Sequence, residues 1–155
     1  MDAIDLKILK EMQENPEIAV SDLALKVGLS HTPCWRRVKK LEADGVIAGR
    51  AILLNPVALG LPVVVFADLK LRQHDEETLE ALEAAARDLD EITECYSMSG
   101  DSDYILRVVV RSIEEYEGLL KKVLLHLPGV SSVHSHFALK CIKNTTRLPI
   151  GSGAR

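Results

Sequence analysis

The chain has 155 residues, of which 47% are hydrophobic and 27% are charged, and its formal net charge is −4. These values are typical of a globular protein and bound the chain to one domain or two small ones. No apolar run reaches the roughly 18 residues that span a bilayer, and the first residues lack a secretory signal, so we expect a cytoplasmic protein. Cys34, Cys95 and Cys141 are odd in number and far apart. This spacing excludes a disulfide framework and a zinc ribbon, and it favours buried, reduced thiols.

Charge is unevenly distributed along the sequence. Residues 1–60 contain eight Lys/Arg and eight Asp/Glu, whereas residues 61–155 contain eleven and fifteen, so the second part holds all of the net charge. This division suggests two different surfaces, one for a polyanion and one for self-association or a small ligand.

Two helices are predicted first. Apolar residues at helical spacing predict a helix over residues 2–14, which Asn15 and Pro16 end. A second, short helix is predicted to begin at Ser21 as its N-cap and to end at Gly28, where a positive φ would stop it.

A third helix is predicted over residues 32–40, with Ser30 or Thr32 as its cap and Pro33 at its first position, where a missing N–H costs nothing. At 100° per residue, its apolar and polar side chains fall on opposite sides. The apolar side consists of Cys34, Val38 and Leu41. The window from Leu23 to Leu41 contains no acidic residue, yet it contains five cations: Lys26, Arg36, Arg37, Lys39 and Lys40.

A short helix, a glycine turn and a basic second helix form the arrangement that a DNA major groove accepts. We therefore interpret residues 32–40 as a DNA recognition helix. The alternative is a solvated basic face on an ordinary helical domain. Three short helices also make a small core, so we expect a partner chain to support them.

The spacing of apolar residues changes after the third helix, from a helical period to the alternation of strands. Residues 46–54 are predicted to form a short wing or linker strand, and the Pro- and Gly-containing residues 55–62 mark a domain boundary. Strands are then predicted over residues 63–72, 92–99, 104–111 and 133–142, and helices over residues 75–89 and 112–127. This β-α-β-β-α-β order predicts a ferredoxin-like sheet with both helices on one face. The uncovered apolar face predicts a sheet-to-sheet homodimer.

The expected fold class is therefore α+β. A winged helix-turn-helix domain over residues 1–60 is joined to a ferredoxin-like domain over residues 61–155, which would bind an effector and oligomerise.

The turn from Ser99 to Tyr104 carries the densest polar chemistry of the second domain. Its backbone N–H groups could hold a carboxylate, and Asp101 or Asp103 could pair with an ammonium, so the turn suits an amino acid zwitterion. A plain hairpin turn is the alternative. His134 and His136 share a strand face and form a possible metal pair, but the spacing fixes no third ligand near them.

Three segments carry a family resemblance: GLSHTPC at residues 28–34, RVKKLE at residues 37–42 and GVI at residues 45–47. They resemble the N-terminal helix-turn-helix of the Lrp/AsnC, or feast/famine, regulators of bacteria and archaea. The GDSDY string at residues 100–104 is similar to the effector-binding turn of that family. The TPCW string at residues 32–35 resembles a subgroup that includes cysteine-responsive regulators.

The recognition-helix interpretation and the resemblance together imply a sequence-specific transcription regulator that responds to a small effector, such as an amino acid, with cysteine as one candidate. DNA contacts are expected from Ser30, His31, Thr32, Pro33, Arg36, Arg37, Lys39, Lys40 and Arg50. The resemblance implies effector contacts from Gly100, Asp101, Asp103 and Tyr104 by motif, and from Met98, Ser135, His136 and Thr145 by position. The expected partners are double-stranded DNA, the effector and further copies of the chain, in a homodimer that assembles into a tetramer or octamer.

Two alternatives belong to other functional classes. One is a constitutive DNA-organising protein of the same architecture, and the other is a small enzyme on the ferredoxin-like domain. The sequence contains no GxSxG, HExxH or Cys-His pattern, so we expect no catalytic residue, no metal and no cofactor.

Overall fold

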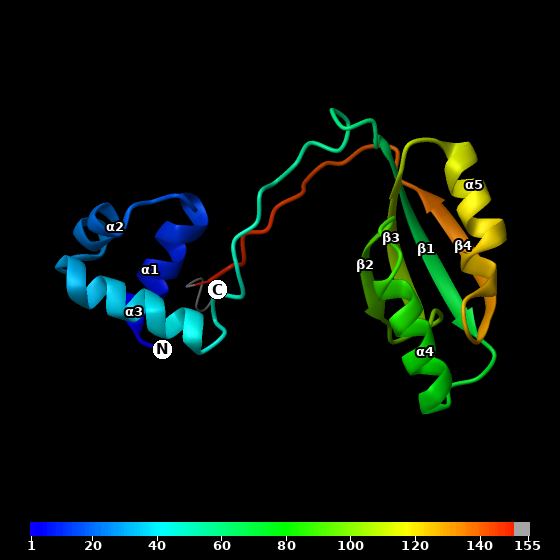
Figure 1. The fold of residues 1–155 in the computed structure, drawn as a ribbon, viewed down its shortest axis with the longest axis horizontal. Helices are drawn as coiled ribbons and strands as arrows, with labels where there is room; N and C mark the ends of the chain where they lie inside the picture. Colours follow the sequence, from blue (N-terminus) through cyan, green and yellow to red (C-terminus); the bar gives the residue numbers. More distant parts are fainter. Residues whose placement is uncertain (151–155) are drawn as a thin grey trace. The chain divides into compact units, whose positions relative to one another are not determined.

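The computed structural model describes residues 1–150, which form two compact units (Figure 1). We call residues 1–53 together with residues 143–150 the helical unit, and residues 54–142 the sheet unit. These bounds differ from the expected domains 1–60 and 61–155, because the chain returns to the helical unit after the last strand of the sheet unit. No helix within residues 1–150 is long and apolar enough to cross a bilayer.

The helical unit is built from α1 (Ala3–Glu14), α2 (Val20–Val27) and α3 (His31–Ala43). Each helix contributes its apolar stripe to one small core, because residues at helical spacing project from one side. The fully enclosed side chains of this core are Ile8, Leu23, Ala24, Val27, Cys34, Val38 and Leu41. The predicted apolar side of the third helix is therefore confirmed.

The helix ends follow the predicted chemistry in part. Gly28 ends α2 with a φ of 75°, as predicted. Ser21 was the wrong cap, because α2 begins at Val20 with Ala19 before it and no side chain caps it. α3 begins at His31 after Ser30, so Pro33 occupies the third helical position rather than the first. Proline is tolerated there because the first N–H groups of a helix have no acceptor within it.

The strand predicted over residues 46–54 is absent, since these residues form neither helix nor strand. A strand needs a hydrogen-bonding neighbour, and no other segment of the described chain pairs with this one. The one bond that fixes its start is donated by the Ile47 N–H to the Leu41 carbonyl oxygen, at 3.1 Å.

The sheet unit has the predicted β-α-β-β-α-β order. Its elements are β1 (Val63–Leu71), α4 (Glu76–Arg87), β2 (Ile92–Ser97), β3 (Tyr104–Val110), α5 (Ile113–Lys122), the short 3-10 helix η1 (Leu124–His126) and β4 (Val130–Phe137). The strands lie in the order β2-β3-β1-β4, and every neighbouring pair is antiparallel. β4 begins three residues before the predicted strand and ends five residues before its predicted end.

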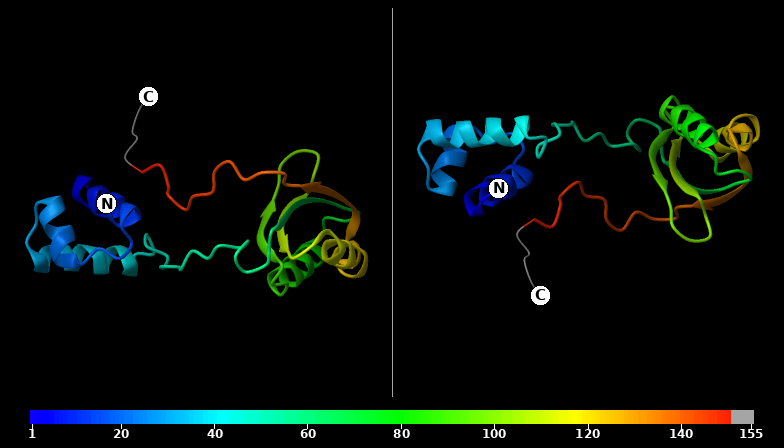
Figure 2. Two further views of the ribbon diagram at one scale, coloured as in Figure 1. Left: turned by 90° about the horizontal axis from the view of Figure 1, so that it is seen from above. Right: turned by 90° about the horizontal axis from the view of Figure 1, so that it is seen from below.

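Both helices of the sheet unit cover the same face of the sheet (Figure 2). From Val65 to Leu71 in β1 and throughout β3, every second side chain is buried beneath α4 and α5, as the period of a strand requires. The buried core is formed by Val65, Ala67, Leu69, Leu71, Leu82, Tyr104, Leu106, Val108, Val110, Tyr116, Leu124, Leu127 and Val130. The ferredoxin-like arrangement is therefore confirmed.

The opposite face of the sheet carries no helix, and we call it the open face. The register places Phe66 beside Arg107 and His136, and Tyr96 beside Ile105. Phe66 is 37% exposed and Tyr96 is 57% exposed. Large apolar side chains on an uncovered sheet are typical of an interface.

Candidate DNA-binding and effector-binding sites

The solvent side of α3 gathers the predicted DNA contacts of this helix. Ser30, His31, Thr32, Pro33, Arg36 and Lys40 are all exposed. Four of them line a hollow of about 590 Å³ together with Arg37 and with Met1, Asp2 and Asp5 at the start of the chain: Thr32, Pro33, Arg36 and Lys40. The N-terminal half of α3 thus forms one wall of an open, charged surface.

The cations of the helical unit are not equally available to a polyanion. Lys39 Nζ lies 2.7 Å from Glu42 Oε2, and this bond lowers the pKa of the Glu42 carboxyl. Lys26 pairs with Glu11 at 2.6 Å. Arg50 is exposed, and its charge also lowers the pKa of Glu42. Arg36 and Lys40, in contrast, have no ion-pair partner within residues 1–150, so they are the free cations of α3.

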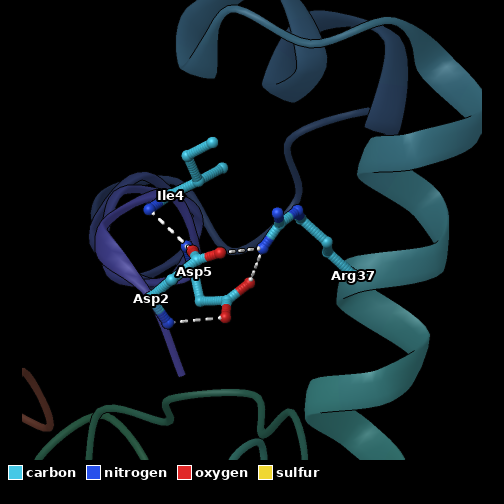
Figure 3. Close-up of polar contacts among 4 residues, drawn as sticks. All are labelled: Asp2, Ile4, Asp5 and Arg37. Carbon is cyan, nitrogen blue, oxygen red and sulfur yellow. Dashed lines mark hydrogen bonds and ion pairs between the residues drawn. The ribbon is translucent and has the colours of Figure 1, made fainter.

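Arg37 turns away from the free surface and binds α1 (Figure 3). Its Nη1 atom lies 2.8 Å from Asp2 Oδ2 and 2.7 Å from Asp5 Oδ1. The pKa of both carboxyls is lowered, first by their backbone hydrogen bonds and then by the bond from Arg37. The sequence gives no signal for this contact, since its partners lie more than thirty residues away.

The turn between β2 and β3 presents the predicted effector residues Met98, Gly100 and Asp101 to solvent. Asp103 is different, because its carboxylate is occupied within the chain. Asp103 Oδ2 accepts from the Leu71 N–H at 2.7 Å, and Oδ1 lies 2.7 Å from His74 Nε2. The backbone bond to Leu71 is the main cause of the lowered pKa of Asp103. This carboxylate anchors the turn to the end of β1.

Tyr104 points beneath the helices rather than toward the turn. Its hydroxyl donates to Glu83 Oε1 at 2.9 Å, and burial together with this carboxylate raises the pKa of Tyr104 to about 12. Glu83, Arg87, Cys95 and Tyr104 line a hollow of about 400 Å³ between α4 and β2. The sequence gives no signal for this hollow, because only the folding of the sheet brings β2 beside α4.

The remaining predicted effector residues do not converge in one chain. Ser135 lies on the helix-covered face, where its Oγ is 2.5 Å from the Tyr116 hydroxyl. His136 lies on the open face with its Nε2 atom 3.1 Å from Asp68 Oδ2. Thr145 belongs to the helical unit, where its Oγ1 accepts from the Arg147 N–H. The strand period alone separates Ser135 from His136, since successive side chains on a strand point to opposite faces.

The cysteines and histidines of residues 1–150 form no metal site. Cys34 is buried and burial raises the pKa of its thiol, but Cys95 and Cys141 are exposed, so the prediction of buried thiols was wrong for these two. The described residues hold no group of three or more His, Cys, Asp and Glu side chains that could bind a metal ion.

Comparisons with known proteins match both units. Residues 1–48 match the family model for a winged helix-turn-helix DNA-binding domain, and residues 64–148 match that for the Lrp/AsnC ligand-binding domain. The chain is 45% identical to a leucine-responsive regulatory protein of Haemophilus influenzae, over 96% of this chain and 89% of that protein.

Two solved structures are similar over nearly the whole chain. An AsnC family transcriptional regulator from Agrobacterium tumefaciens is 46% identical with a TM-score of 0.90, covering 96% of this chain and 97% of that one. A transcriptional regulator from Neisseria meningitidis, solved as a complex with L-Met, is 34% identical with a TM-score of 0.91, covering 96% of each chain. With the two family models on successive parts of the sequence and relatives that match it nearly end to end, this chain belongs to the Lrp/AsnC family of DNA-binding transcriptional regulators.

Proposed function

We propose that this chain binds a specific duplex DNA sequence through α3 and that a free amino acid, bound by the sheet unit, changes that binding. The observation that carries the DNA part is the solvent side of α3, where Thr32, Arg36 and Lys40 follow one another at four-residue spacing without an acidic neighbour on the helix between them. Residues four apart lie on one face, so this stripe can enter a major groove as a unit.

The proposed contacts divide by chemistry. Ser30, His31, Thr32 and Pro33 lie at the N-terminal end of α3, the end that approaches base edges in helix-turn-helix proteins. Arg36 is the side chain suited to a bidentate contact with guanine. Lys39, Lys40 and Arg50 would bind phosphate, which fixes register without reading sequence.

The effector proposal rests on the exposed turn and on the family. The Neisseria meningitidis relative is a complex with L-Met, and residues 64–148 match the ligand-binding domain of the family. Asp101 is exposed and its carboxylate accepts no hydrogen bond within residues 1–150, so it is the better candidate than Asp103 to pair with an ammonium. Met98 and Gly100 complete the exposed part of the turn.

We further propose that two chains associate through the open faces of their sheets, and that these dimers form a tetramer or octamer in the cytoplasm. Two-fold symmetry would present two copies of α3 to DNA. The corresponding binding site is pseudo-palindromic, with half-sites about one helical turn, or a multiple of it, apart. The separated effector residues of a single chain would be completed by a neighbouring copy.

The test is recovery of genomic DNA fragments by the purified protein, with and without a mixture of the twenty amino acids. We expect a pseudo-palindromic motif whose occupancy changes with one amino acid, and loss of its enrichment in Arg36→Ala. Asp22→Asn, a change on the exposed side of α2, is the control that should retain it. Recovery that no amino acid alters would indicate a constitutive DNA-organising protein, and no enriched fragment in any condition would refute specific binding.

A further inference from the structure

We infer that Arg37, the second arginine of the recognition helix, does not contact DNA but locks α3 against α1, and thereby sets which side chains of α3 reach the bases. This inference rests on the proposed function, since it assumes that α3 enters DNA. It assigns the two adjacent arginines to different roles, with Arg36 as a contact and Arg37 as a positioning residue.

Asp2 and Asp5 link the N-terminus of α1 to Arg37 through one connected hydrogen-bond network (Figure 3). Asp2 Oδ1 accepts from the N–H groups of Ile4 and Asp5, both at 2.9 Å, while Asp2 Oδ2 accepts from Arg37. Asp5 Oδ2 accepts from the Asp2 N–H at 2.9 Å, while Asp5 Oδ1 accepts from Arg37. Each carboxylate therefore uses one oxygen to cap α1 and the other to hold α3.

The burial of these groups supports a permanent contact. The Asp5 side chain is 15% exposed and the Arg37 side chain is 32% exposed, so water screens this pair less than the surface pairs of the unit. Charge-assisted hydrogen bonds with one partner shielded are stronger than those between mobile surface side chains. The Asp2 side chain, at 54% exposed, is the weaker of the two partners.

Transfer of Arg37 to a phosphate would be unfavourable. It would break two charge-assisted bonds to form one new contact, and it would leave the carboxylates of Asp2 and Asp5 without a counterion on the wall of the hollow that the proposed DNA surface shares. Uncompensated carboxylates beside a polyanion repel it. Arg37 is therefore more useful to DNA binding in its present place than as a contact.

The contact also helps to fix the rotation of α3 about its own axis, together with the buried side chains of Cys34, Val38 and Leu41. Successive residues of a helix are 100° apart, so a helix that holds Arg37 against α1 must direct Arg36 to solvent. Thr32 and Lys40 lie on the same face as Arg36, one turn before it and one turn after it. Loss of the Arg37 contact would allow α3 to rotate or tilt, and these three side chains would lose their register with the bases.

The test compares two affinities for each full-length variant, one for a fragment recovered from the genome and one for a random-sequence duplex, at a temperature where circular dichroism shows the variant folded. A change in net charge affects both affinities alike, because phosphate attraction is independent of sequence. The ratio of the specific to the random-duplex affinity therefore reports how α3 is positioned on the bases, and a change in net charge does not alter it.

We expect Asp5→Asn to lower this ratio by about tenfold, the size of one lost base contact, even though it removes a negative charge near DNA. The control Asp22→Asn removes the same charge from α2 and should leave the ratio unchanged. We expect Arg37→Ala to lower the ratio similarly and Arg37→Lys to restore part of it, without a change in the salt dependence of binding. Arg36→Ala, in contrast, should reduce the slope of log affinity against log salt by about one if Arg36 holds phosphate, or lower the ratio if it reads a base.

Different results would overturn the inference. If Arg37 reads DNA directly, Asp5→Asn frees it and the ratio stays the same or rises. If Arg37 binds phosphate, Arg37→Ala reduces the salt slope by about one. If Arg37 only stabilises the fold, folded Arg37→Ala keeps the wild-type ratio of the two affinities. A wild-type protein that binds both duplexes equally would instead refute specific recognition by α3, which is a failure of the proposed function itself.

Discussion

Several carboxylates of this protein accept hydrogen bonds from backbone N–H groups. Asp2 caps α1, Asp75 caps α4 through the Thr78 N–H at 3.0 Å, and Asp103 accepts from the Leu71 N–H. An ionised carboxylate is a stronger acceptor than a neutral amide, so each of these contacts depends on the charge of the acid. The residues that look most available for a ligand are therefore partly committed to the fold.

Replacement of Asp103 tests this commitment. Asp103→Asn keeps the shape of the side chain but removes its charge, and we expect the free energy of unfolding at pH 7 to fall by about 1–2 kcal/mol. The folded-state pKa of Asp103 is lowered from its ordinary value of 3.8. The Asp103 carboxylate therefore contributes fully to the free energy of unfolding above about pH 4. This contribution is lost as the pH falls through the lowered pKa of Asp103 in the folded protein.

Urea unfolding of both proteins at several pH values measures this effect. The difference between wild type and Asp103→Asn should shrink below about pH 4, because Asp103 then becomes neutral in the wild type as well. Asp101→Asn, at an exposed position of the same turn, should change stability little at any pH. A pH-independent difference for Asp103→Asn would contradict the anchoring role of the charge.

For single residues, the sequence reveals the chemistry of each side chain but not the groups that it contacts. Both Arg37 and Asp103 have the chemistry of ligand contacts, and their residue types predict ligand binding for both. Their contacts within the chain are made with residues far away in the sequence, at Asp2, Asp5 and Leu71. Only the packing of α1 against α3, and of the β2–β3 turn against β1, brings these groups together.

Whole elements are far more predictable, because the apolar period that defines them is local. The order of the five α-helices and four strands in residues 1–150, the buried side of α3 and the covered face of the sheet all follow from side-chain spacing. The failures occur where an element depends on a neighbour. Residues 46–54 have the composition of a strand but no strand beside them, and the bounds of β4 follow its pairing with β1.

The open face of the sheet leads to a prediction about self-association. Phe66 lies on the central strand β1, and its exposed ring would be buried by a second sheet. We expect Phe66→Glu to weaken self-association at least about 100-fold, because it would remove the exposed ring and bury a charged side chain at the centre of the interface. Sedimentation velocity over a range of concentrations measures this change.

A matched control lies on the other side of the same unit. Ile113 is 59% exposed at the first position of α5, where a negative charge is compatible with the helix N-terminus. Ile113→Glu should retain the assembly of the wild type. An unchanged assembly in folded Phe66→Glu would mean that the subunits associate through another surface.

At the scale of the whole molecule, the last described residues contribute to the first helix. The Leu148 N–H donates to Gln13 Oε1 at 2.6 Å, and Gln13 Nε2 donates back to the Leu148 carbonyl at 3.2 Å. Arg147 Nη2 donates to the Glu14 carbonyl at 3.5 Å. The Arg147 bond satisfies a carbonyl at the C-terminal end of α1, where helix carbonyls lack partners, and the Leu148 bonds hold the Gln13 side chain.

Removal of the residues after Ile142 should therefore loosen the last turn of α1. We expect the amides of this turn to exchange with solvent about fivefold to tenfold faster, the effect of about 1 kcal/mol of lost hydrogen bonding. Hydrogen exchange of the free protein measures this, and Gln13→Ala in the full-length chain should produce most of the same effect. Equal protection in all three proteins would show that the tail does not stabilise α1.

The return of the chain to the helical unit makes the sheet unit an insertion in topological terms. Residues 1–53 and 143–150 flank it on both sides, so the sheet unit has two covalent junctions with the helical unit and not one. A graft of the sheet unit onto another DNA-binding domain must therefore join two ends of the chain, and not one.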